Sequence, residues 1–306
     1  MEPAGSRLLL LDTASLYFRA FYGVPESITA PDGTPVNAVR GLLDFIAHLV
    51  TVRSPRRVVA CLDADWRPAF RVEALPSYKA HRLADPATGA EQVPAALETQ
   101  VPVILDVLDA LGIANVGVAG FEADDVIGTL AARETGDVDV VTGDRDLFQL
   151  VDDARGVRVL YTARGVGRHE VVDEAAVTAK YGIPGRAYAD FAILRGDPSD
   201  GLPGVKGVGD KTAATLVTRF GDIDGIIAAA KDSTAEMSPT VRRRLLDAAD
   251  YLAVAPAVVR VRTDVPLPAY DDTLPRDPKN PEALVDLGER WNLDSPLNRV
   301  LTAMAR

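Results

Sequence analysis

Short apolar runs alternate with helical patterns through the first half of the chain. The runs at residues 7–11, 57–62, 115–118 and 138–141 contain few polar positions, and a further run follows at 157–161. Such runs are typical of strands buried on both faces of a parallel sheet. Between them, apolar positions recur at helical spacing over residues 14–22, 36–52, 101–111 and 124–133. Alternation of this kind predicts an α/β fold with a mostly parallel central sheet flanked by helices.

Residues 64–94 interrupt the alternation. The segment holds four prolines, is rich in arginine and lysine, and has no steady apolar period. A loop of this length inside a compact domain is usually functional or disordered. We interpret it, at about residues 64–95, as a long basic excursion over the sheet.

The second half of the chain is mainly helical. Helical patterns cover residues 173–181, 188–194, 211–220, 223–230 and 239–253, and a proline-rich segment from about residue 264 is expected to wrap the surface. We therefore predict two parts, an α/β core over residues 1–170 and a smaller helical part over residues 171–306.

Composition gives little further information on the fold, but the distribution of charge indicates what kind of molecule the protein binds. The 306 residues include 47% hydrophobic and 25% charged residues, which is ordinary for a globular protein. The formal net charge is -11, yet basic residues concentrate at 67–82, 206–211 and 242–244. An acidic centre flanked by basic patches favours an enzyme that grips a polyanion and neutralises its own acids with metal.

The cysteine content and the length of the apolar runs indicate the cellular compartment. The single cysteine, Cys61, lies in an apolar run, so we expect a buried strand residue and no intramolecular disulfide. No apolar run reaches the roughly 18 residues that span a bilayer, and no leader segment is recognisable. We expect a cytoplasmic protein without a membrane partner.

Carboxylates are the main candidates for chemistry. Residues 121–153 contain ten acids against two arginines. Nine acids stand at predicted strand ends or in short clusters: Asp12, Asp63, Glu122, Asp124, Asp125, Asp144, Asp146, Asp197 and Asp200. The carboxyl ends of parallel strands meet at one edge of a sheet, so several of these acids should converge there. Their repulsion would raise pKa values unless cations relieve it, and oxygen-only ligands select hard ions such as Mg²⁺ or Mn²⁺.

A second motif points to nucleic acid. Gly207, Val208 and Gly209 form a predicted tight turn before a helix, with Lys206 and Lys211 beside it. Backbone N–H groups at such a turn can hold a phosphate oxygen. The arrangement, at about residues 188–220, is similar to a helix-hairpin-helix element that grips the DNA backbone without reading bases. A simple helix–helix connection is the alternative.

These motifs together resemble the FEN-type 5′ nuclease family, which comprises flap endonucleases and the 5′-nuclease domain of bacterial DNA polymerase I. The matching pieces span about residues 7–220: Leu11-Asp12 with residues 17–21, Asp63 with residues 70–71 and 76–82, residues 122–125, residues 142–150, residues 181–184, and residues 192–213. The resemblance implies a PIN-like 5′-nuclease fold with a helical arch formed by the basic excursion and a helix–three-turn–helix region.

The resemblance also implies roles for individual residues. Asp12, Asp63, Glu122 and Asp124 would hold a first metal, and Asp144, Asp146, Asp197 and Asp200 would serve a second, with Asp125 near both. Lys79, Arg82 and Arg71 of the arch would steady the scissile phosphate, and Arg19 is a further candidate for a phosphate contact. A K⁺ ion is implied on backbone oxygens near Val205 and Val208, and a third Mg²⁺ or Mn²⁺ stays open.

The implied activity is hydrolysis of DNA near a 5′ flap or a nicked or gapped duplex, as flap endonuclease or 5′-exonuclease, in replication and repair. A monomer is expected, with DNA polymerase as a candidate partner. Two alternatives remain: a DNA-structure-binding protein without catalysis, and a metal-dependent phosphohydrolase on RNA or small molecules. The chain has Gly201 where the family usually has Asn, and no polymerase motif, so a stand-alone nuclease and a fragment of a polymerase both stay open.

Overall fold

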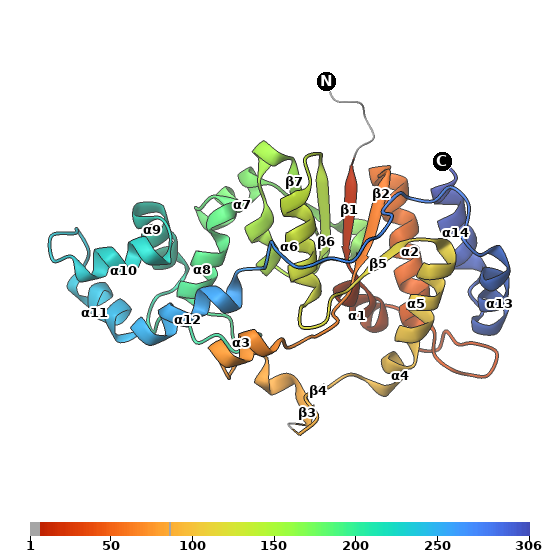
Figure 1. The fold of residues 1–306 in the computed structure, drawn as a ribbon, viewed down its shortest axis with the longest axis horizontal. Helices are drawn as coiled ribbons and strands as arrows, with labels where there is room; N and C mark the ends of the chain where they lie inside the picture. Colours follow the sequence, from red (N-terminus) through yellow and green to blue (C-terminus); the bar gives the residue numbers. More distant parts are fainter. Residues whose placement is uncertain (1–6, 86) are drawn as a thin grey trace.

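The computed structural model describes residues 7–85 and 87–306. Its centre is a six-stranded sheet in the order β5-β2-β1-β6-β7-β8 (Figure 1). The strands are β1 (Leu8–Asp12), β2 (Arg57–Cys61), β5 (Ala114–Val116), β6 (Val138–Thr142), β7 (Val157–Tyr161) and β8 (Glu170–Val172). All neighbouring pairs are parallel except β7 with β8. The predicted mostly parallel α/β sheet is confirmed.

Strand β1 lies at the point where the strand order reverses. The chain moves from β1 outward to β2 and β5, then returns to place β6 on the other side of β1. In open α/β sheets, a crevice forms outside the carboxyl ends of the strands at such a switch point. Asp12 at the end of β1 and the residues after β6 therefore face one crevice.

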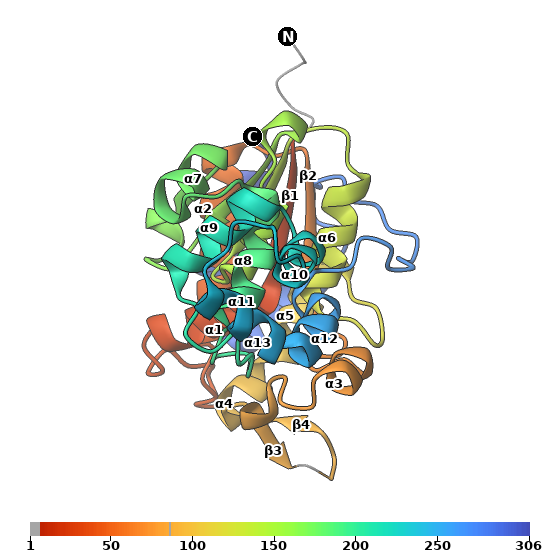
Figure 2. The same ribbon diagram turned by 90° about the vertical axis from the view of Figure 1, so that its left-hand side faces the viewer.

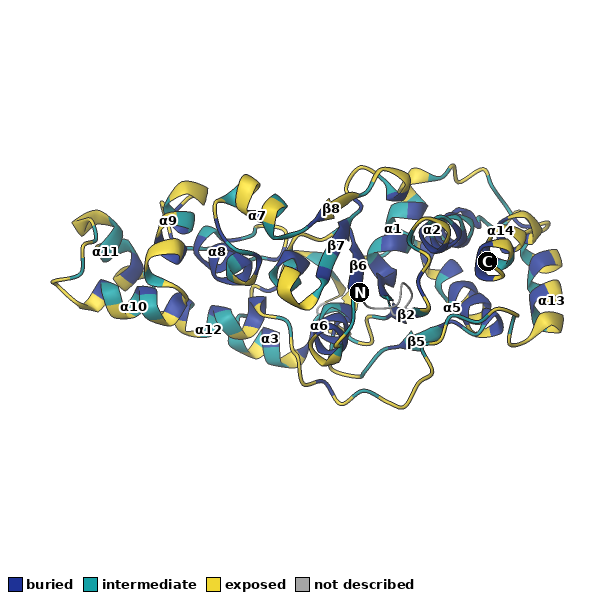
Figure 3. Cartoon of the chain, turned by 90° about the horizontal axis from the view of Figure 1, so that it is seen from above, coloured by how far each residue is buried: buried dark blue, intermediate teal, exposed yellow. Residues whose placement is uncertain are grey.

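Both faces of the sheet are covered, which explains the uninterrupted apolar runs. Leu8 and Leu10 of β1 pack toward one side of the sheet with α6 (Ala123–Arg133), while Leu9 and Leu11 pack toward the other. That second side is covered by α1 (Thr13–Gly23), α2 (Asn37–Arg53) and α5 (Gln100–Leu111). Figure 3 shows the buried sheet between these helices.

The helical part extends from one end of the sheet (Figures 1 and 2). It contains α7 (Glu174–Tyr181), α8 (Tyr188–Arg195), α9 (Asp210–Phe220), α10 (Ile223–Lys231), α11 (Pro239–Asp247) and α12 (Ala249–Val259). Its buried side chains are continuous with the core under α6. Asp173, Asp222 and Ser238 begin α7, α10 and α11 by accepting hydrogen bonds from backbone N–H groups in the first turn of each helix.

The prediction that the helical part extends from residue 171 to residue 306 is wrong for the last two helices. Helices α13 (Pro281–Trp291) and α14 (Asp294–Met304) pack on α5 and α2, at the far end of the core from α9–α11 (Figure 1). Leu284, Leu297 and Val300 are buried in the core on that side. The outer faces of α2 and α5 are apolar, so residues 281–304 complete the α/β core rather than the helical part.

The proline-rich segment from about residue 264 lies on the surface, as predicted, and is bonded to β2. Val58 N–H donates to Asp272 O at 2.8 Å, and Leu274 N–H donates to Arg56 O at 2.8 Å. The Arg57 guanidinium also pairs with Asp272 at 2.7 Å. These bonds fasten the proline-rich segment beside β2.

The basic excursion is not a helical arch in this structure. Its described residues form one short helix, α3 (Ala69–Ala74), a 3₁₀ turn at Ala80–Arg82 and a hairpin of β3 (Leu83–Asp85) with β4 (Ala90–Glu91). The short helix α4 (Ala95–Glu98) then leads to α5. Pro68 and Pro94 precede α3 and α4, and Pro76 follows α3; a proline disfavours helical backbone in the residue before it, which limits the extension of these helices. The excursion lies below the carboxyl ends of the strands (Figure 1).

Across residues 7–85 and 87–306, no helix has the length and apolar character needed to cross a membrane.

Candidate active site

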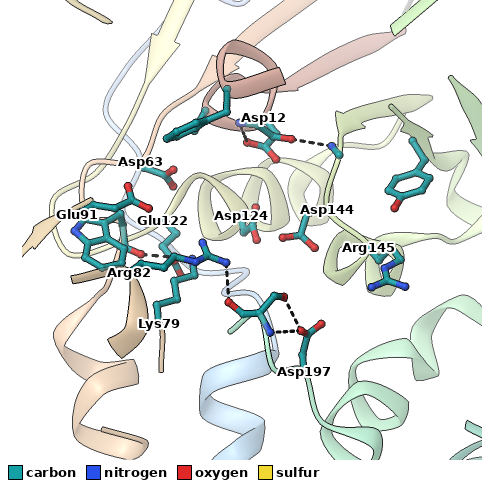
Figure 4. A pocket seen from close by; sticks show the side chains of 17 residues that line it. Asp12, Asp63, Lys79, Arg82, Glu91, Glu122, Asp124, Asp144, Arg145 and Asp197 are labelled. Carbon is teal, nitrogen blue, oxygen red and sulfur yellow. Dashed lines mark hydrogen bonds and ion pairs between the residues drawn. The ribbon is translucent and has the colours of Figure 1, made fainter. Parts of the chain in front are cut away.

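A pocket of about 390 Å³ lies between the carboxyl ends of the strands, the excursion and the loop after α8. Six of the nine predicted acids line it: Asp12, Asp63, Glu122, Asp124, Asp144 and Asp197. They point toward the pocket from several separate elements (Figure 4). The predicted convergence of the acids at one edge of the sheet is therefore present in the structure.

Asp12 is held by the elements on either side of it. Its carboxylate accepts from Ser15 N–H at 3.1 Å, which begins α1, and from the Thr142 hydroxyl at 2.6 Å, which ends β6. Burial, together with the nearby Asp63, raises the pKa of Asp12 to about 7. The carboxylate is thus in an environment that favours a proton or a cation.

Helix α6 presents its first turn to the pocket. Ala123 N–H donates to the Asp63 carboxylate at 2.7 Å, which joins the end of β2 to the start of α6. Asp124 follows in that first turn, and burial raises its pKa well above its usual value, with Asp12 and Asp144 adding repulsion. The acids of residues 122–125 therefore cap α6 and also bring carboxylates to the pocket.

Asp125 does not face the pocket, contrary to its predicted place near both metals. Its side chain is fully buried, and the Arg71 guanidinium donates to both of its oxygens at 2.6 and 2.7 Å. Arg262 N–H donates to it as well, at 2.9 Å. In a helix, the third position after the N-cap turns back toward the cap, which places Asp125 inward while Asp124 faces the pocket.

Arg71 is likewise not available to a phosphate, so its predicted contact is wrong. It is 2% exposed and pairs with Glu122 and Asp125, while its Nε donates to Val258 O at 2.9 Å. Burial works to lower the pKa of Arg71, but these two carboxylates outweigh it and raise the pKa. Arg71 joins the excursion, α6 and α12 in one buried network.

Lys79 and Arg82 do line the pocket, opposite the strand ends. Lys79 pairs with Glu122, whose carboxylate also accepts from the Tyr78 hydroxyl at 2.8 Å. Arg82 pairs with Asp200 at 2.8 Å and donates to Ser199 O at 2.9 Å. These two cations are therefore placed within reach of a phosphate bound between the acids.

The remaining acids surround the far side of the pocket. Asp146 N–H donates to the Asp144 carboxylate at 2.9 Å, and Asp197 accepts from Ser199 N–H at 2.8 Å. Burial raises the pKa of Asp146 well above its usual value, and Asp144, Asp200 and Asp197 contribute in that order. Asp146 and Asp200 thus belong to the same electrostatic cluster, although they do not line the cavity.

The acids surround the pocket rather than meet at one point. Across the described ranges, no three His, Cys, Asp or Glu side chains lie close enough together to hold a metal ion as they are now arranged. Lys79 and Arg82 instead neutralise part of the acidic charge through Glu122 and Asp200.

The site also includes residues, in or behind the pocket wall, that the sequence did not single out for chemistry. Thr142 holds Asp12, and Glu91 of β4 and Arg145 line the cavity. Thr142 stands beside Asp144 in the chain, which could have indicated it. Glu91 gave no such signal, because its position depends on how the excursion folds back.

The base of the excursion is bonded to the loop after α8. Lys79 N–H donates to Asp200 O at 3.0 Å, and the Ser77 hydroxyl donates to Gly201 O at 2.9 Å. Gly201 has φ +73°, and a Cβ there would lie 2.1 Å from Ser77 O. Glycine at this position therefore allows the close approach, which explains the departure from the family's usual Asn.

The predicted DNA-gripping turn lies between α8 and α9, as expected. Lys206, Gly207, Gly209 and Lys211 are exposed, whereas the side chains of Val205 and Val208 are buried and Val208 N–H donates to Val205 O at 2.9 Å. The Arg244 guanidinium of α11 donates to Gly207 O at 2.9 Å. Arg244 was part of a basic run in the sequence, but its contact with this turn depends on tertiary packing.

Arg19 lies outside the acidic pocket. Its Nη1 donates to Ala163 O at 3.2 Å, and its side chain lines a neighbouring cavity. Its predicted contact with a phosphate therefore stays a prediction, at a place beside the acidic pocket.

Comparison with known proteins agrees with this fold. Residues 7–182 match the family model of the 5'-3' exonuclease N-terminal resolvase-like domain, and residues 183–282 match that of the 5'-3' exonuclease C-terminal SAM fold. A 5'-3' exonuclease of Streptomyces coelicolor is 64% identical, covering 97% of this chain and 99% of that protein. A 5'-3' exonuclease of Mycobacterium tuberculosis is 52% identical over 98% of both chains.

DNA polymerase I of Mycobacterium leprae is 36% identical over 97% of this chain, which corresponds to 32% of that protein. Among solved structures, the T5 5'-exonuclease with bound zinc ions is similar in fold, with a TM-score of 0.62 and 17% identity over 97% of this chain and 98% of that one. The catalytic core of Rad2 in complex with DNA substrate gives a TM-score of 0.59 at 15% identity, covering 98% and 93% of the two chains. The chain therefore belongs to the 5'-3' exonuclease family, whose members are metal-dependent nucleases that hydrolyse DNA phosphodiester bonds.

Proposed function

We propose that this protein is a structure-specific 5′ nuclease that cuts DNA at 5′ flaps and 5′ ends near duplex junctions by two-metal-ion catalysis. The observation that carries the proposal is the pocket at the switch point of the sheet, where buried acids repel one another and two cations stand opposite. Such a pocket accepts multiply charged cations on one wall and a phosphate on the other.

The acids divide into two sets around the pocket. Asp12, Asp63, Glu122 and Asp124 would hold one ion, and Asp144, Asp146, Asp197 and Asp200 would hold the other. The raised pKa values of Asp12, Asp124 and Asp146 fit this assignment, because each reports a carboxylate in need of positive charge. Asp125 is left out of both sets because, unlike Glu122, it does not line the pocket, and Arg71 donates to both of its oxygens.

The oxygen-only donor set favours Mg²⁺ or Mn²⁺. When bound, the ions supply a water of lowered pKa and stabilise charge on the attacking and leaving oxygens. A third divalent ion and a K⁺ on the backbone oxygens of Val205 and Val208 remain part of the proposal.

The chain's own residues orient the phosphate. Lys79 and Arg82 reach the pocket from the excursion, where their N–H groups can hold the non-bridging oxygens of the scissile phosphate. Their present partners, Glu122 and Asp200, are acids that we assign to metal. Cation binding by these acids would free both side chains for the phosphate.

The duplex is proposed to lie against the turn between α8 and α9. Lys206 and Lys211 are exposed beside Gly207 and Gly209, which suits contact with the DNA backbone. A cytoplasmic, monomeric enzyme that acts beside DNA polymerase is the wider setting we propose.

One set of substrates tests the proposal. Labelled 5′-flap, nicked and blunt duplexes are incubated with Mg²⁺, Mn²⁺ or EDTA, using the parent protein and the variants Asp124→Ala, Asp144→Ala and Asp146→Ala. We expect flap cleavage only with metal, and loss of cleavage by roughly a thousandfold or more in each variant with flap binding retained. Asp286→Ala, an exposed acid on α13, is the matched control. Unreduced turnover in all three variants would refute the assignment.

Lys79 has a separate test. Lys79→Ala should slow the single-turnover cleavage rate more than it weakens flap binding, because its ammonium group acts on the phosphate at the reacting centre. An unchanged single-turnover rate would exclude that role.

A further inference from the structure

A second cavity, of about 930 Å³, adjoins the acidic pocket. It lies between the outer face of α1 and the loop that joins β7 to β8. Ser15 and Phe18 line both cavities, so the two lie side by side along α1. We call this second cavity the α1 groove; it is further lined by Arg19, Tyr22, Gly23, Val24, Phe45 and residues 163–168.

The charge of the α1 groove is opposite to that of the pocket. Three arginines line it, Arg19, Arg164 and Arg168, and no acid does. None of the three forms an ion pair within residues 7–85 and 87–306, in a chain whose net charge is -11. Arg164 and Arg168 are exposed. The groove is therefore an electropositive surface directly beside an electronegative one.

The groove also presents aromatic side chains. Ser15, Phe18, Arg19 and Tyr22 are spaced at three, four and seven residues along α1, which places them on one face of the helix. Tyr22 is 73% exposed, the most exposed large apolar side chain of the described residues. An exposed aromatic ring in the same cavity as three arginines suits a single strand, because a base can stack on the ring while the phosphates follow the cations.

Arg19 fixes the shape of the groove. Its Nη1 bonds Ala163 O, which ties the β7–β8 loop to α1, and its Nε is buried without a hydrogen-bond partner. The loop itself turns at Gly165, whose φ is +98°. The two walls are thus held at a set spacing by a residue of the groove.

We propose that the α1 groove binds single-stranded DNA, namely the unpaired segment that continues from the acidic pocket. This proposal rests on the proposed function, because it extends the path of the same substrate. A phosphodiester backbone that leaves the acid-lined pocket is repelled there, and the arginines that line the adjoining groove attract it. Its phosphates would follow Arg164 and Arg168, and one base would stack on Tyr22.

Binding of a single strand without cleavage tests the groove directly. The affinity of a fluorescein-labelled oligothymidylate is measured by anisotropy in EDTA over a series of salt concentrations. We expect Tyr22→Ala to weaken binding at least about fivefold, through loss of base stacking. Replacing both Arg164 and Arg168 by Ala should reduce the log–log salt slope by about 1.4, at about 0.7 for each phosphate contact on a single strand.

Two controls make the result specific. Arg276→Ala removes an exposed arginine from the proline-rich segment beside β2, which does not line the groove, and it should leave single-strand binding unchanged. A blunt duplex without a single strand should bind the groove variants as it binds the parent. Circular dichroism confirms folding, which these exposed substitutions should not disturb.

The outcomes separate this proposal from the wider one. Parent-like single-strand affinity and salt slope in the groove variants would overturn the groove, even while the parent protein cleaves flaps. Failure of the parent protein to cleave any flap would instead refute the proposed function, and the anisotropy result would still decide whether the groove binds a single strand.

Discussion

At the scale of single residues, neighbours of the same type have different roles. Arg71 and Arg82 both belong to the basic excursion, and the sequence predicts a phosphate contact for each. The structure places Arg82 at the pocket and Arg71 in the interior, against Glu122 and Asp125. Helix α3 turns Arg71 toward α6 and α12, and two buried carboxylates need its charge.

Replacement of Arg71 tests this internal role. Arg71→Met should lower the free energy of unfolding by about 3–5 kcal/mol, because it leaves Asp125 buried without its partner. Urea unfolding followed by circular dichroism measures the change. Arg82→Met is the matched comparison on the same excursion; it should cost less stability, since Arg82 is 37% exposed.

A phosphate contact would produce the opposite pattern. If Arg71→Met keeps parental stability while flap affinity and its salt slope fall, then Arg71 is a DNA contact after all, and the buried network is not what holds it.

At the scale of elements, three consecutive arginines of α11 separate into three environments. Arg242 donates to backbone oxygens at the end of α10, among them Ala229 O and Ala230 O at 2.9 and 2.8 Å. Arg243 is exposed, and Arg244 reaches Gly207 O. Successive helical residues point about 100° apart, so only one of the three can reach the DNA-gripping turn.

Arg244 is therefore expected to support duplex binding. Arg244→Ala should weaken duplex affinity about three- to tenfold, because a charged hydrogen bond to the turn and one cation beside it are lost. Anisotropy with a labelled duplex in EDTA measures this, with Arg243→Ala as the matched control on the same helix. Arg244→Lys retains the charge but not the guanidinium geometry, so it should recover the salt slope without the full affinity.

Equal losses in Arg243→Ala and Arg244→Ala would contradict the specific role of the contact with Gly207. Such a result would indicate that α11 acts only through its overall charge.

At the scale of the whole molecule, the acidic cluster lowers stability in the absence of cations. A carboxyl group whose pKa is raised by folding binds its proton more tightly in the folded state, so its contribution favours folding at low pH. That contribution is lost as pH rises from the usual pKa of the group to its pKa in the folded protein. For Asp12 this window extends from 3.8 to about 7. The pKa values of Asp124 and Asp146 are raised in the same direction.

Stability should therefore depend on pH and metal together. In EDTA, we expect the unfolding midpoint Tm to fall by roughly 5 °C or more between pH 5 and pH 8, because a few kcal/mol of repulsion appear. Saturating Mg²⁺ should remove most of that fall. Asp124→Asn should raise Tm in EDTA at pH 8, whereas Asp286→Asn, on the exposed face of α13, should not. Identical pH profiles with and without Mg²⁺ would argue against a metal-relieved cluster.

The placement of α13 and α14 gives a second prediction at this scale. Removal of residues 281–306 should prevent stable folding, because Leu284, Leu297 and Val300 each contribute about 1.5–3 kcal/mol through burial. Leu297→Ala alone should cost about 2–5 kcal/mol in urea unfolding. Val285 of α13 is 58% exposed, so Val285→Ala should leave the free energy of unfolding almost unchanged. Cooperative unfolding of the truncated chain at the parental Tm would contradict this account.

The sequence by itself determined the sheet, its layers and the edge at which the acids meet. Continuous apolar runs such as residues 8–11 require burial on both faces, and a strand's direction decides where the residue after it lies. These are local properties, so Asp12, Asp63 and Asp144 could be placed near one another, and Lys206 and Lys211 at an exposed turn, from spacing alone.

Tertiary structure alone decided which charges face the pocket and which face each other. Asp124 and Asp125 are adjacent in the chain, yet one faces the pocket and the other pairs with Arg71. The end of the chain likewise returned to the α/β core, and α1 with a distant loop formed a basic groove. Such outcomes depend on packing between segments far apart in sequence, since a buried charge must find its partner wherever the fold places one.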